Sequence, residues 1–256
     1  MRVLTAIPVY NEERHLLEVL REVGRYSSEI LVVNDGSTDR TQELLAGQKD
    51  VRVITHPHNR GYGAALISAF AFALEQAVDI LVTTDCDGQH EPARIPVLLE
   101  AIHNADIVSG SRYLRDFRQN TRPPQDRFEI NRQITALLNE RFGLHLTDAF
   151  CGFKAYRRET LERLRITETG WGMPLQLWVQ AARLGLRIKE VGVPRVYLDS
   201  ERAFGGALND ATQRLAYYRG VVAAAEHDVI PVGRPVHEQS TCSPCSSFWT
   251  CEETCW

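Results

Sequence analysis

The sequence lacks any long hydrophobic run, and this absence bears on where the protein is expected to reside. No window approaches the roughly 18 apolar residues that a membrane-spanning helix requires. Residues 1–8 hold too short an apolar run for a secretory signal peptide and lead directly into a predicted strand. We therefore expect a protein that is made and kept in the cytosol.

An excess of positive charge is also missing. The chain carries 29 Lys and Arg against 33 Asp and Glu, a net charge of −4, so binding along nucleic acid is not expected. Cysteine is scarce in the body of the chain, where Cys86 and Cys151 are interpreted as reduced, buried thiols. With 256 residues and 44% hydrophobic residues, the chain can bury a full core, and we expect one domain with appendages.

Short apolar strands alternate with helical patterns through the first half of the chain. Strands are predicted at residues 3–7, 30–33, 51–54, 80–84 and 107–109, and Pro8 is expected to end the pairing of the first. This alternation predicts an α/β fold with a central, mostly parallel sheet and helices on both faces. Ligands of such sheets bind at the carboxyl ends of the strands, so segments 8–12, 34–35 and 85–89 and Arg112 should converge on one crevice.

Two aspartates follow the fourth predicted strand with one residue between them. Whether the strand continues or turns, the Asp85 and Asp87 carboxylates should lie close together, where they repel each other unless a cation is bound. Oxygen ligands of this kind suit Mg²⁺ or Mn²⁺, with substrate phosphates completing the coordination. The structural alternative is a turn that happens to be acidic.

Two further segments admit a functional and a structural interpretation. Gly61 and Gly63 precede an alanine-rich helix, where they either let a phosphate or ribose approach the backbone or simply permit a tight turn. Residues 112–132 hold six arginines and three acids, with an irregular stretch around Pro123 and Pro124. This segment is either a basic wall that receives an anion or a solvated loop.

Five motifs resemble, in order and spacing, those of the family 2 glycosyltransferases, whose nucleotide-sugar-binding fold is called GT-A. They are residues 7–13 (IPVYNEE), 33–39 (VNDGSTD), 61–63 (GYG), 85–89 (DCDGQ) and 110–112 (GSR). Residues 148–154 (DAFCGFK) most resemble the polyprenyl-phosphate sugar transferases within that family, the dolichyl-phosphate mannosyltransferase group. The resemblance covers residues 2–206.

The resemblance implies a donor site and a metal site. The residues that would hold the base and ribose of a nucleotide-sugar donor are Pro8, Tyr10, Glu12 and Asp35, with Gly61 assigned to the same site. Asp85, Asp87 and Gln89 would bind Mg²⁺ or Mn²⁺ together with the donor diphosphate.

The resemblance also implies that Arg112 and Arg132 meet a donor or acceptor phosphate. Arg202 stands where the group has the arginine of an Arg-x-x-Gly-x-Ser-Lys motif, but residues 202–208 read RAFGGAL, without the terminal Ser-Lys. Gln176 stands where the group commonly has a glutamate. These departures concern the acceptor side and leave the donor motifs intact.

The predicted function is that of a metal-dependent, inverting glycosyltransferase acting on a polyprenyl phosphate or other lipid-linked acceptor. This places the protein in the cytoplasm, in peripheral contact with the inner membrane face. A phosphate acceptor, with a second pKa near ~6, needs no general base, whereas a hydroxyl acceptor does. Asp148 is the candidate base, the structural alternative being an acid that caps a turn. Transfer to a hydroxyl of a glycan or lipid, and a non-catalytic nucleotide-sugar-binding module, are the alternative functions.

The C-terminal residues form a separate unit in this interpretation, with a glycosyltransferase domain at 1–227 and a cysteine-rich tail at 228–256. The tail holds two cysteine pairs that could form a tetrathiolate Zn²⁺ site, at Cys242, Cys245, Cys251 and Cys255. Only five residues separate the pairs, which is tighter than in usual zinc ribbons. A redox pair and a disordered tail anchored by Trp249 and Trp256 are equally open interpretations.

Overall fold

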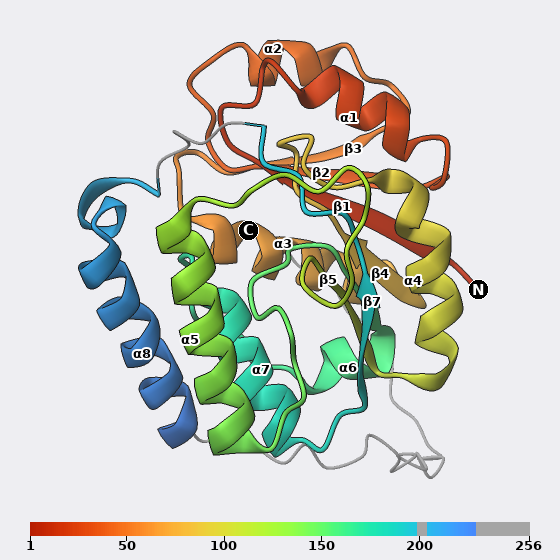
Figure 1. The fold of residues 1–256 in the computed structure, drawn as a ribbon. Helices are drawn as coiled ribbons and strands as arrows, with labels where there is room; N and C mark the ends of the chain where they lie inside the picture. Colours follow the sequence, from red (N-terminus) through yellow and green to blue (C-terminus); the bar gives the residue numbers. More distant parts are fainter. Residues whose placement is uncertain (199–203, 229–256) are drawn as a thin grey trace, which may run out of the picture.

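The computed structural model describes residues 1–198 and 204–228. Figure 1 shows a central sheet with helices on both faces, which confirms the predicted α/β architecture. The strands are β1 (Val3–Val9), β2 (Ile30–Asn34), β3 (Arg52–Thr55), β4 (Ile80–Thr83), β5 (Ile107–Ser111), β6 (Lys154–Arg157) and β7 (Ile188–Gly192). The α-helices are α1 (Leu16–Val23), α2 (Thr41–Ala46), α3 (Tyr62–Glu75), α4 (Ile95–Ala101), α5 (Gln125–Phe142), α6 (Arg158–Arg163), α7 (Met173–Arg183) and α8 (Ala211–His227).

The sheet is mostly parallel, with the strand order β3-β2-β1-β4-β6-β5-β7. Among the strands of the described residues, only β6 runs antiparallel, between β4 and β5, and the sequence pattern did not predict this strand. The other neighbouring strands are parallel, so the carboxyl ends of β1, β2 and β4 meet at one edge. The sheet therefore brings together three of the loops that carry the predicted motifs.

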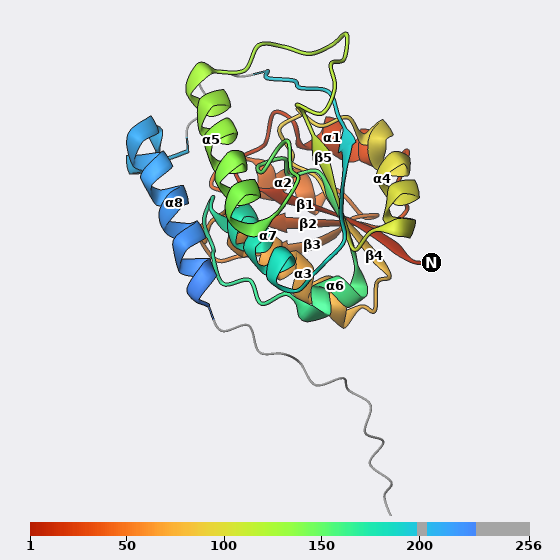
Figure 2. The same cartoon turned by 60° about the horizontal axis from the view of Figure 1, so that its bottom comes forward.

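Alternating side chains on the strands bury both faces of the sheet. On β2, Leu31 and Val33 enter one hydrophobic cluster, whereas Ile30 and Val32 enter the other. The first cluster also contains side chains of α3, α5, α6, α7 and α8, and the second contains side chains of α1 and α4. Figure 2 shows α5, α7 and α8 grouped on one side of the sheet with α1 and α4 on the other. Two-sided burial explains the nearly continuous apolar runs of these strands.

Contrary to the sequence prediction, Pro8 does not end the pairing of β1. The strand continues to Val9, and Pro8 lies opposite Val33 of β2. The Asp35 N–H donates to the Val9 carbonyl of β1 at 2.8 Å, so Val9 faces β2 and the preceding Pro8 faces the β4 side. The β1–β4 ladder ends at Ala6, so the missing N–H of Pro8 falls where no ladder bond is needed.

The starts of two helices have identifiable local causes. α5 begins at Gln125, because Pro124 just before it adopts an extended backbone (φ −54°, ψ 134°) and ends the irregular segment. α8 begins at Ala211. The Asp210 side chain caps it by accepting a hydrogen bond from the Gln213 N–H at 2.8 Å.

Two predictions fall on parts of the chain that the structure does not describe. Arg202 lies outside the described residues, as do Cys242, Cys245, Cys251 and Cys255 of the predicted tail. Within residues 1–198 and 204–228, no helix combines the length and the apolar character needed to cross a bilayer.

Candidate active site

A cavity of about 900 Å³ opens at the carboxyl ends of β1, β2 and β4. Its volume is in the range of small-molecule sites, roughly 300–1,000 Å³. The structure brings together here most of the predicted site residues, namely Pro8, Tyr10, Glu12, Asp35, Gly61, Asp85, Asp87, Gln89 and Arg112. The fold thus brings the separate motifs together in one cavity, as expected from the sequence.

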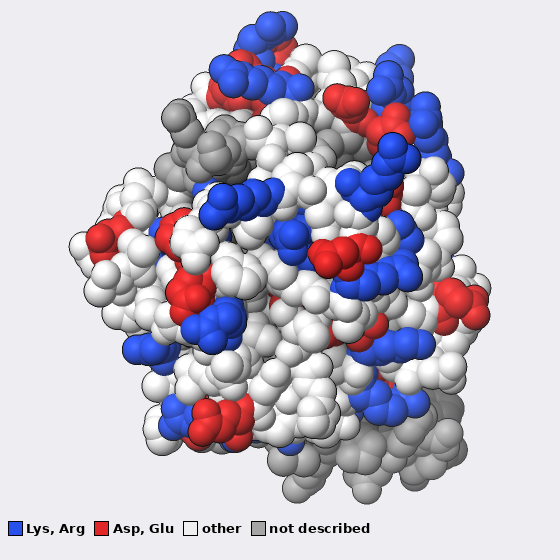
Figure 3. Space-filling view, in the orientation of Figure 1, with Lys and Arg blue, Asp and Glu red and all other residues white. Residues whose placement is uncertain are grey.

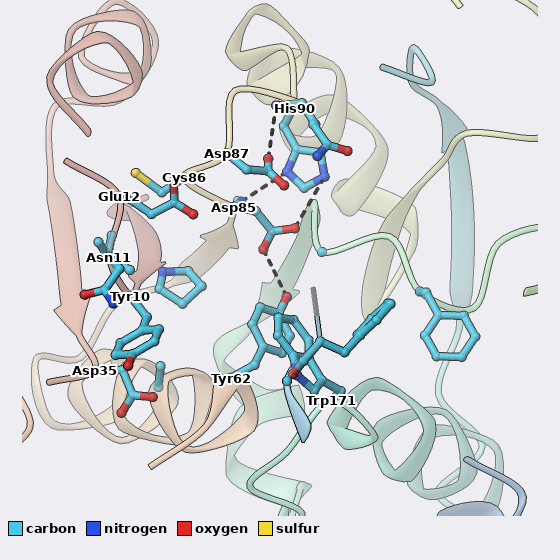
Figure 4. Close-up of a pocket in the computed structure, with 18 of the residues that line it drawn as sticks. Tyr10, Asn11, Glu12, Asp35, Tyr62, Asp85, Cys86, Asp87, His90 and Trp171 are labelled. Carbon is cyan, nitrogen blue, oxygen red and sulfur yellow. Dashed lines mark hydrogen bonds and ion pairs between the residues drawn. The ribbon is translucent and has the colours of Figure 1, made fainter. Parts of the chain in front are cut away.

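Asp85 lies in the cavity wall with its carboxylate held on three sides. Tyr62 Oη donates a hydrogen bond to Asp85 Oδ1 at 3.1 Å, and His90 Nε2 lies 3.7 Å from Oδ2 (Figure 4). The backbone of Gly152 forms the third side, since a Cβ atom there would come within 2.6 Å of Oδ1 and still closer to Oδ2. These contacts hold the carboxylate in one orientation.

Asp87 occupies the turn that follows β4. Its Oδ1 accepts a hydrogen bond from the Gln89 N–H at 3.0 Å, and Gly88 between them has a positive φ of 70°. The turn therefore keeps Asp87 on the cavity wall near Asp85, as Figure 4 shows.

The donor set fits a magnesium or manganese ion that shares its coordination with a substrate. Asp85 and Asp87 offer two carboxylates to the same cavity. Among residues 1–198 and 204–228, no group of three or more His, Cys, Asp and Glu side chains is placed to hold a metal by itself. Mg²⁺ is usually bound through one or two carboxylates and keeps its other positions for phosphate oxygens and water.

His90 lines the cavity, although the sequence motifs predicted no role for it. Its Nδ1 accepts a hydrogen bond from the Asp85 N–H at 3.1 Å, and its ring stacks on Phe153 with 5.3 Å between centroids. Accepting at Nδ1 leaves the ring proton on Nε2, which faces the Asp85 carboxylate. His90 thus supports both the backbone and the side chain of Asp85.

Asp35 is buried and organises the loop before α3. Its carboxylate accepts hydrogen bonds from the backbone N–H groups of Arg60 (2.9 Å) and Gly61 (2.8 Å). His56 Nδ1 lies 2.6 Å from Oδ1, and its Nε2 lies 2.8 Å from Ser68 Oγ. Gly61 has a φ of 104°, a conformation that favours glycine, so it shapes the turn as well as lining the cavity.

Arg112 and Asp148 form a buried ion pair beside the cavity. Arg112 Nε donates to Asp148 Oδ2 at 2.7 Å, and Nη2 donates to Oδ1 at 2.9 Å. Burial acts to raise the pKa of Asp148, but the charge and hydrogen bonds of Arg112, with a bond from Asn131, outweigh it and hold the pKa at about 2. Arg112 lines the cavity and Asp148 does not, so Asp148 acts here by positioning Arg112.

The structure does not bring Arg132 to the cavity. Its side chain is 62% exposed and pairs with Glu129 on the surface of α5, at 2.6 Å. Arg127 lines the cavity instead, together with Ile130 and Asn131. Residues three and four positions after Arg127 share its helix face, whereas Arg132 does not.

Further cavity residues come from the α7 and α8 region. The Trp171 ring stacks on Tyr62 with centroids 5.2 Å apart and meets the edge of Phe204 at 5.5 Å. Arg127 and Arg214 lie over the Phe204 ring, at 5.1 and 4.4 Å from its centroid. Arg127 belongs to the basic segment 112–132 of the sequence, whereas no predicted motif contains Trp171 or Arg214. Only the packing of α5 against α8 brings Arg127 and Arg214 to the same ring.

Gln176, a departure from the resembling group, lies away from the cavity lining. Its Oε1 accepts hydrogen bonds from the N–H groups of Thr167 and Glu168, both at 2.8 Å. The side chain therefore supports the loop before α7.

Comparison with known proteins relates the whole domain to sugar transferases. The Glycosyl transferase family 2 model matches residues 5–165. The undecaprenyl-phosphate mannosyltransferase of Micrococcus luteus is 36% identical over 82% of this chain and 91% of its own length. The polyprenol monophosphomannose synthase of Mycolicibacterium smegmatis is 31% identical over 75% of this chain and 76% of its own.

Among solved structures, the fold is similar to that of glucosyl-3-phosphoglycerate synthase from Mycobacterium tuberculosis, described in complex with Mg²⁺ and UDP. The TM-score is 0.67 and the sequence identity 21%, over 88% of this chain and 79% of that one. At this level of identity the similarity concerns the fold alone.

Proposed function

Because the chain belongs to glycosyl transferase family 2, we propose that it transfers a sugar from a nucleoside-diphosphate sugar to a polyprenyl phosphate, with inversion at the anomeric carbon. The observation that carries this proposal is the single cavity shared by the Asp85 and Asp87 carboxylates, the donor motifs and Arg112. The polyprenyl-phosphate acceptors in the names of the relatives support the acceptor class.

The donor half of the reaction requires charge stabilisation on the departing nucleoside diphosphate. Asp85 and Asp87 would hold Mg²⁺ or Mn²⁺, which supplies Lewis-acid stabilisation of that leaving group when bound. Tyr62, His90 and the Gly152 backbone keep the Asp85 carboxylate oriented for this task. Arg112 adds a fixed positive charge at the same cavity, and preorganised charge of this kind lowers the barrier most effectively.

The acceptor half is consistent with a nucleophile that arrives already ionised. Asp148 is fully buried and has a pKa of about 2, so it is a weak base and lies away from the cavity lining. A lipid phosphate needs no base. Arg127 places a guanidinium group on the α5 side of the cavity, and Arg214, which forms an ion pair with Asp126, places another on the α8 side. The Trp171 and Phe204 rings offer an apolar surface beside that charge.

The test combines the protein with Mn²⁺ and a panel of nucleotide sugars, with and without polyprenyl phosphate. We expect glycolipid and nucleoside diphosphate to form only when donor, acceptor and metal are all present, with an inverted anomeric centre by NMR. Asp87→Asn should abolish turnover, whereas Asp50→Asn, which alters an exposed acid away from the cavity, should leave it unchanged.

Other outcomes would contradict the proposal in recognisable ways. Donor binding without release of diphosphate would indicate a non-catalytic binding module. Product formed only with a hydroxyl acceptor would indicate transfer to a glycan or lipid hydroxyl. Undiminished turnover in a chelator would remove the metal from the mechanism.

The cysteine-rich segment raises a separate metal prediction. A Zn²⁺ site at Cys242, Cys245, Cys251 and Cys255 stays a prediction, since these residues lie outside the described ranges. Metal analysis of the protein with and without its last twenty residues tests it.

A further inference from the structure

A basic rim borders the mouth of the cavity, formed by residues 113–124 between β5 and α5 and residues 193–198 after β7. The Thr121 N–H donates to the Arg195 carbonyl at 2.7 Å, and the Tyr197 N–H donates to Thr121 Oγ1 at 2.8 Å. The Arg195 N–H also donates to Asn120 Oδ1 at 2.8 Å. Figure 2 shows the two segments projecting together at the end of the molecule opposite α6.

The rim is more positive than the rest of the chain. Its residues include four arginines and one aspartate, a net charge of +3 in a chain whose total is −4. Arg115, Arg118 and Arg122 are exposed. Within residues 1–198 and 204–228, no carboxylate forms an ion pair with any of these three guanidinium groups. Figure 3 shows basic side chains spread over the face that carries the rim.

Two large apolar side chains stand beside these charges. Leu114 is 45% exposed and Leu198 is 60% exposed. Leu198 also lies near the turn that holds Asp87, since a Cβ atom at Gly88 would be 3.2 Å from Leu198 Cδ1. Tyr197, next to Leu198, lines the cavity and lies 3.4 Å from Arg112 Nη1. The exposed rim and the candidate active site are therefore continuous.

We propose that the rim docks on a bilayer containing anionic phospholipid and turns the cavity mouth toward the membrane. Exposed arginines provide the charge complementarity, and exposed leucines can enter the headgroup region beside them. The inference rests on the proposed function in one respect, which is that a membrane-held acceptor gives the docking its purpose. The docking itself requires no sugar donor and is measured separately.

The expected contribution of the arginines to membrane binding follows from their number. Each Lys or Arg near an anionic surface strengthens binding about fivefold, so three of them contribute roughly a hundredfold. Because this attraction is electrostatic, raising the salt concentration should weaken it.

The test measures co-sedimentation of the full chain with vesicles of phosphatidylcholine alone or mixed with phosphatidylglycerol. We expect the wild type to prefer the anionic vesicles and the variant Arg115→Ser/Arg118→Ser/Arg122→Ser to bind them about a hundredfold more weakly. The control Arg163→Ser/Arg165→Ser/Arg187→Ser removes equal charge from exposed positions at or next to α6 and at the start of β7. It should stay within about threefold of wild type, because that end of the molecule faces away from the membrane.

Substituting the two leucines tests the apolar part of the docking separately from the charges. Leu114→Ser/Leu198→Ser should reduce the binding that persists at high salt, whereas Val97→Ser, 39% exposed on α4, should not. Equal vesicle binding by wild type and the rim variant, or no preference of the wild type for anionic lipid, would overturn the proposal. In that case the rim would serve another partner, such as an acidic protein.

Turnover of a short-chain, water-soluble polyprenyl phosphate without vesicles separates this inference from the proposed function. The rim variant should retain that turnover, because its three arginines do not line the cavity. Vesicle binding that depends on the rim, without any turnover, would contradict the proposed function and support the docking. Turnover, together with vesicle binding that does not depend on the rim, would support the proposed function and contradict the docking. Thermal unfolding of every variant verifies that it is folded.

Discussion

The guanidinium group of Arg112 reaches the cavity wall while two of its nitrogens bind the buried carboxylate of Asp148, at 2.7 and 2.9 Å. Asp148 is fully buried and Arg112 is 17% exposed, so the pair is shielded from water on one side only. The cation facing the cavity is therefore fixed before any ligand arrives.

Asp148→Asn should destabilise the fold by about 3–5 kcal/mol, because it leaves the largely buried Arg112 cation without its counter-ion. Urea denaturation measures the change. Glu129→Gln is the matched control, since it breaks the exposed pair with Arg132 and should produce little measurable change. Equal losses in the two variants would show that burial of the Arg112–Asp148 pair has no energetic consequence.

The same pair should make stability depend on pH in the acid range. Burial acts against ionisation of Asp148, but Arg112 and Asn131 outweigh it and hold the pKa at about 2, below the ordinary value near ~3.9. A lowered pKa stabilises the fold above about pH 4 and ceases to do so as the pH falls toward 2. The stability difference between wild type and Asp148→Asn should therefore narrow by about 1 kcal/mol from pH 6 to pH 3. Urea titrations at both pH values measure this, and a constant difference would contradict it.

Gly152→Ala should weaken metal-dependent activity by about 10–100-fold, because the added methyl group would displace the Asp85 carboxylate. The apparent affinity for Mn²⁺ should fall with it, and a titration of turnover against Mn²⁺ measures both effects. Gly220→Ala in α8, where a Cβ atom meets nothing within 4 Å, is the control and should slightly stabilise the helix. A wild-type dependence of turnover on Mn²⁺ in Gly152→Ala would show that the loop moves to accommodate the methyl group and leaves Asp85 in place.

Arg112→Lys should lower kcat/KM by about 10-fold or more, because lysine keeps the charge but loses the two-pronged contact with Asp148. Arg132→Lys should stay near wild type, since that side chain lies on the outer surface of α5. Steady-state kinetics of the two variants compare one substitution at two positions. A larger loss at Arg132 would mean that α5 turns this arginine inward when substrate binds.

Much of the candidate site could be predicted because its residues immediately follow strands. The apolar run before Asp85 ends β4, and the run before Asp35 ends β2, so local sequence already assigns both aspartates to one edge of the sheet. The antiparallel β6 could not be predicted in this way. It is four residues long and pairs only with distant strands, so no local periodicity reports it.

The direction of the arginine side chains could not be predicted from the sequence. The charges between Arg112 and Arg132 identify a basic segment, but they do not determine which of its arginines point toward the cavity. The packing of α5 turns Arg127 toward the cavity and Arg132 toward solvent, and α8 adds Arg214 from a remote part of the chain.

The sequence by itself determined the α/β architecture, the strand ends that carry the donor motifs, and the position of Asp85 and Asp87 just after β4. These depend on short-range periodicity and on the fixed direction of parallel strands. Only the tertiary structure decided that Asp148 holds Arg112, that Tyr62, His90 and Gly152 orient Asp85, and that a basic rim borders the cavity. Those contacts join segments far apart in the chain, and their geometry is set by how helices and loops pack on the sheet.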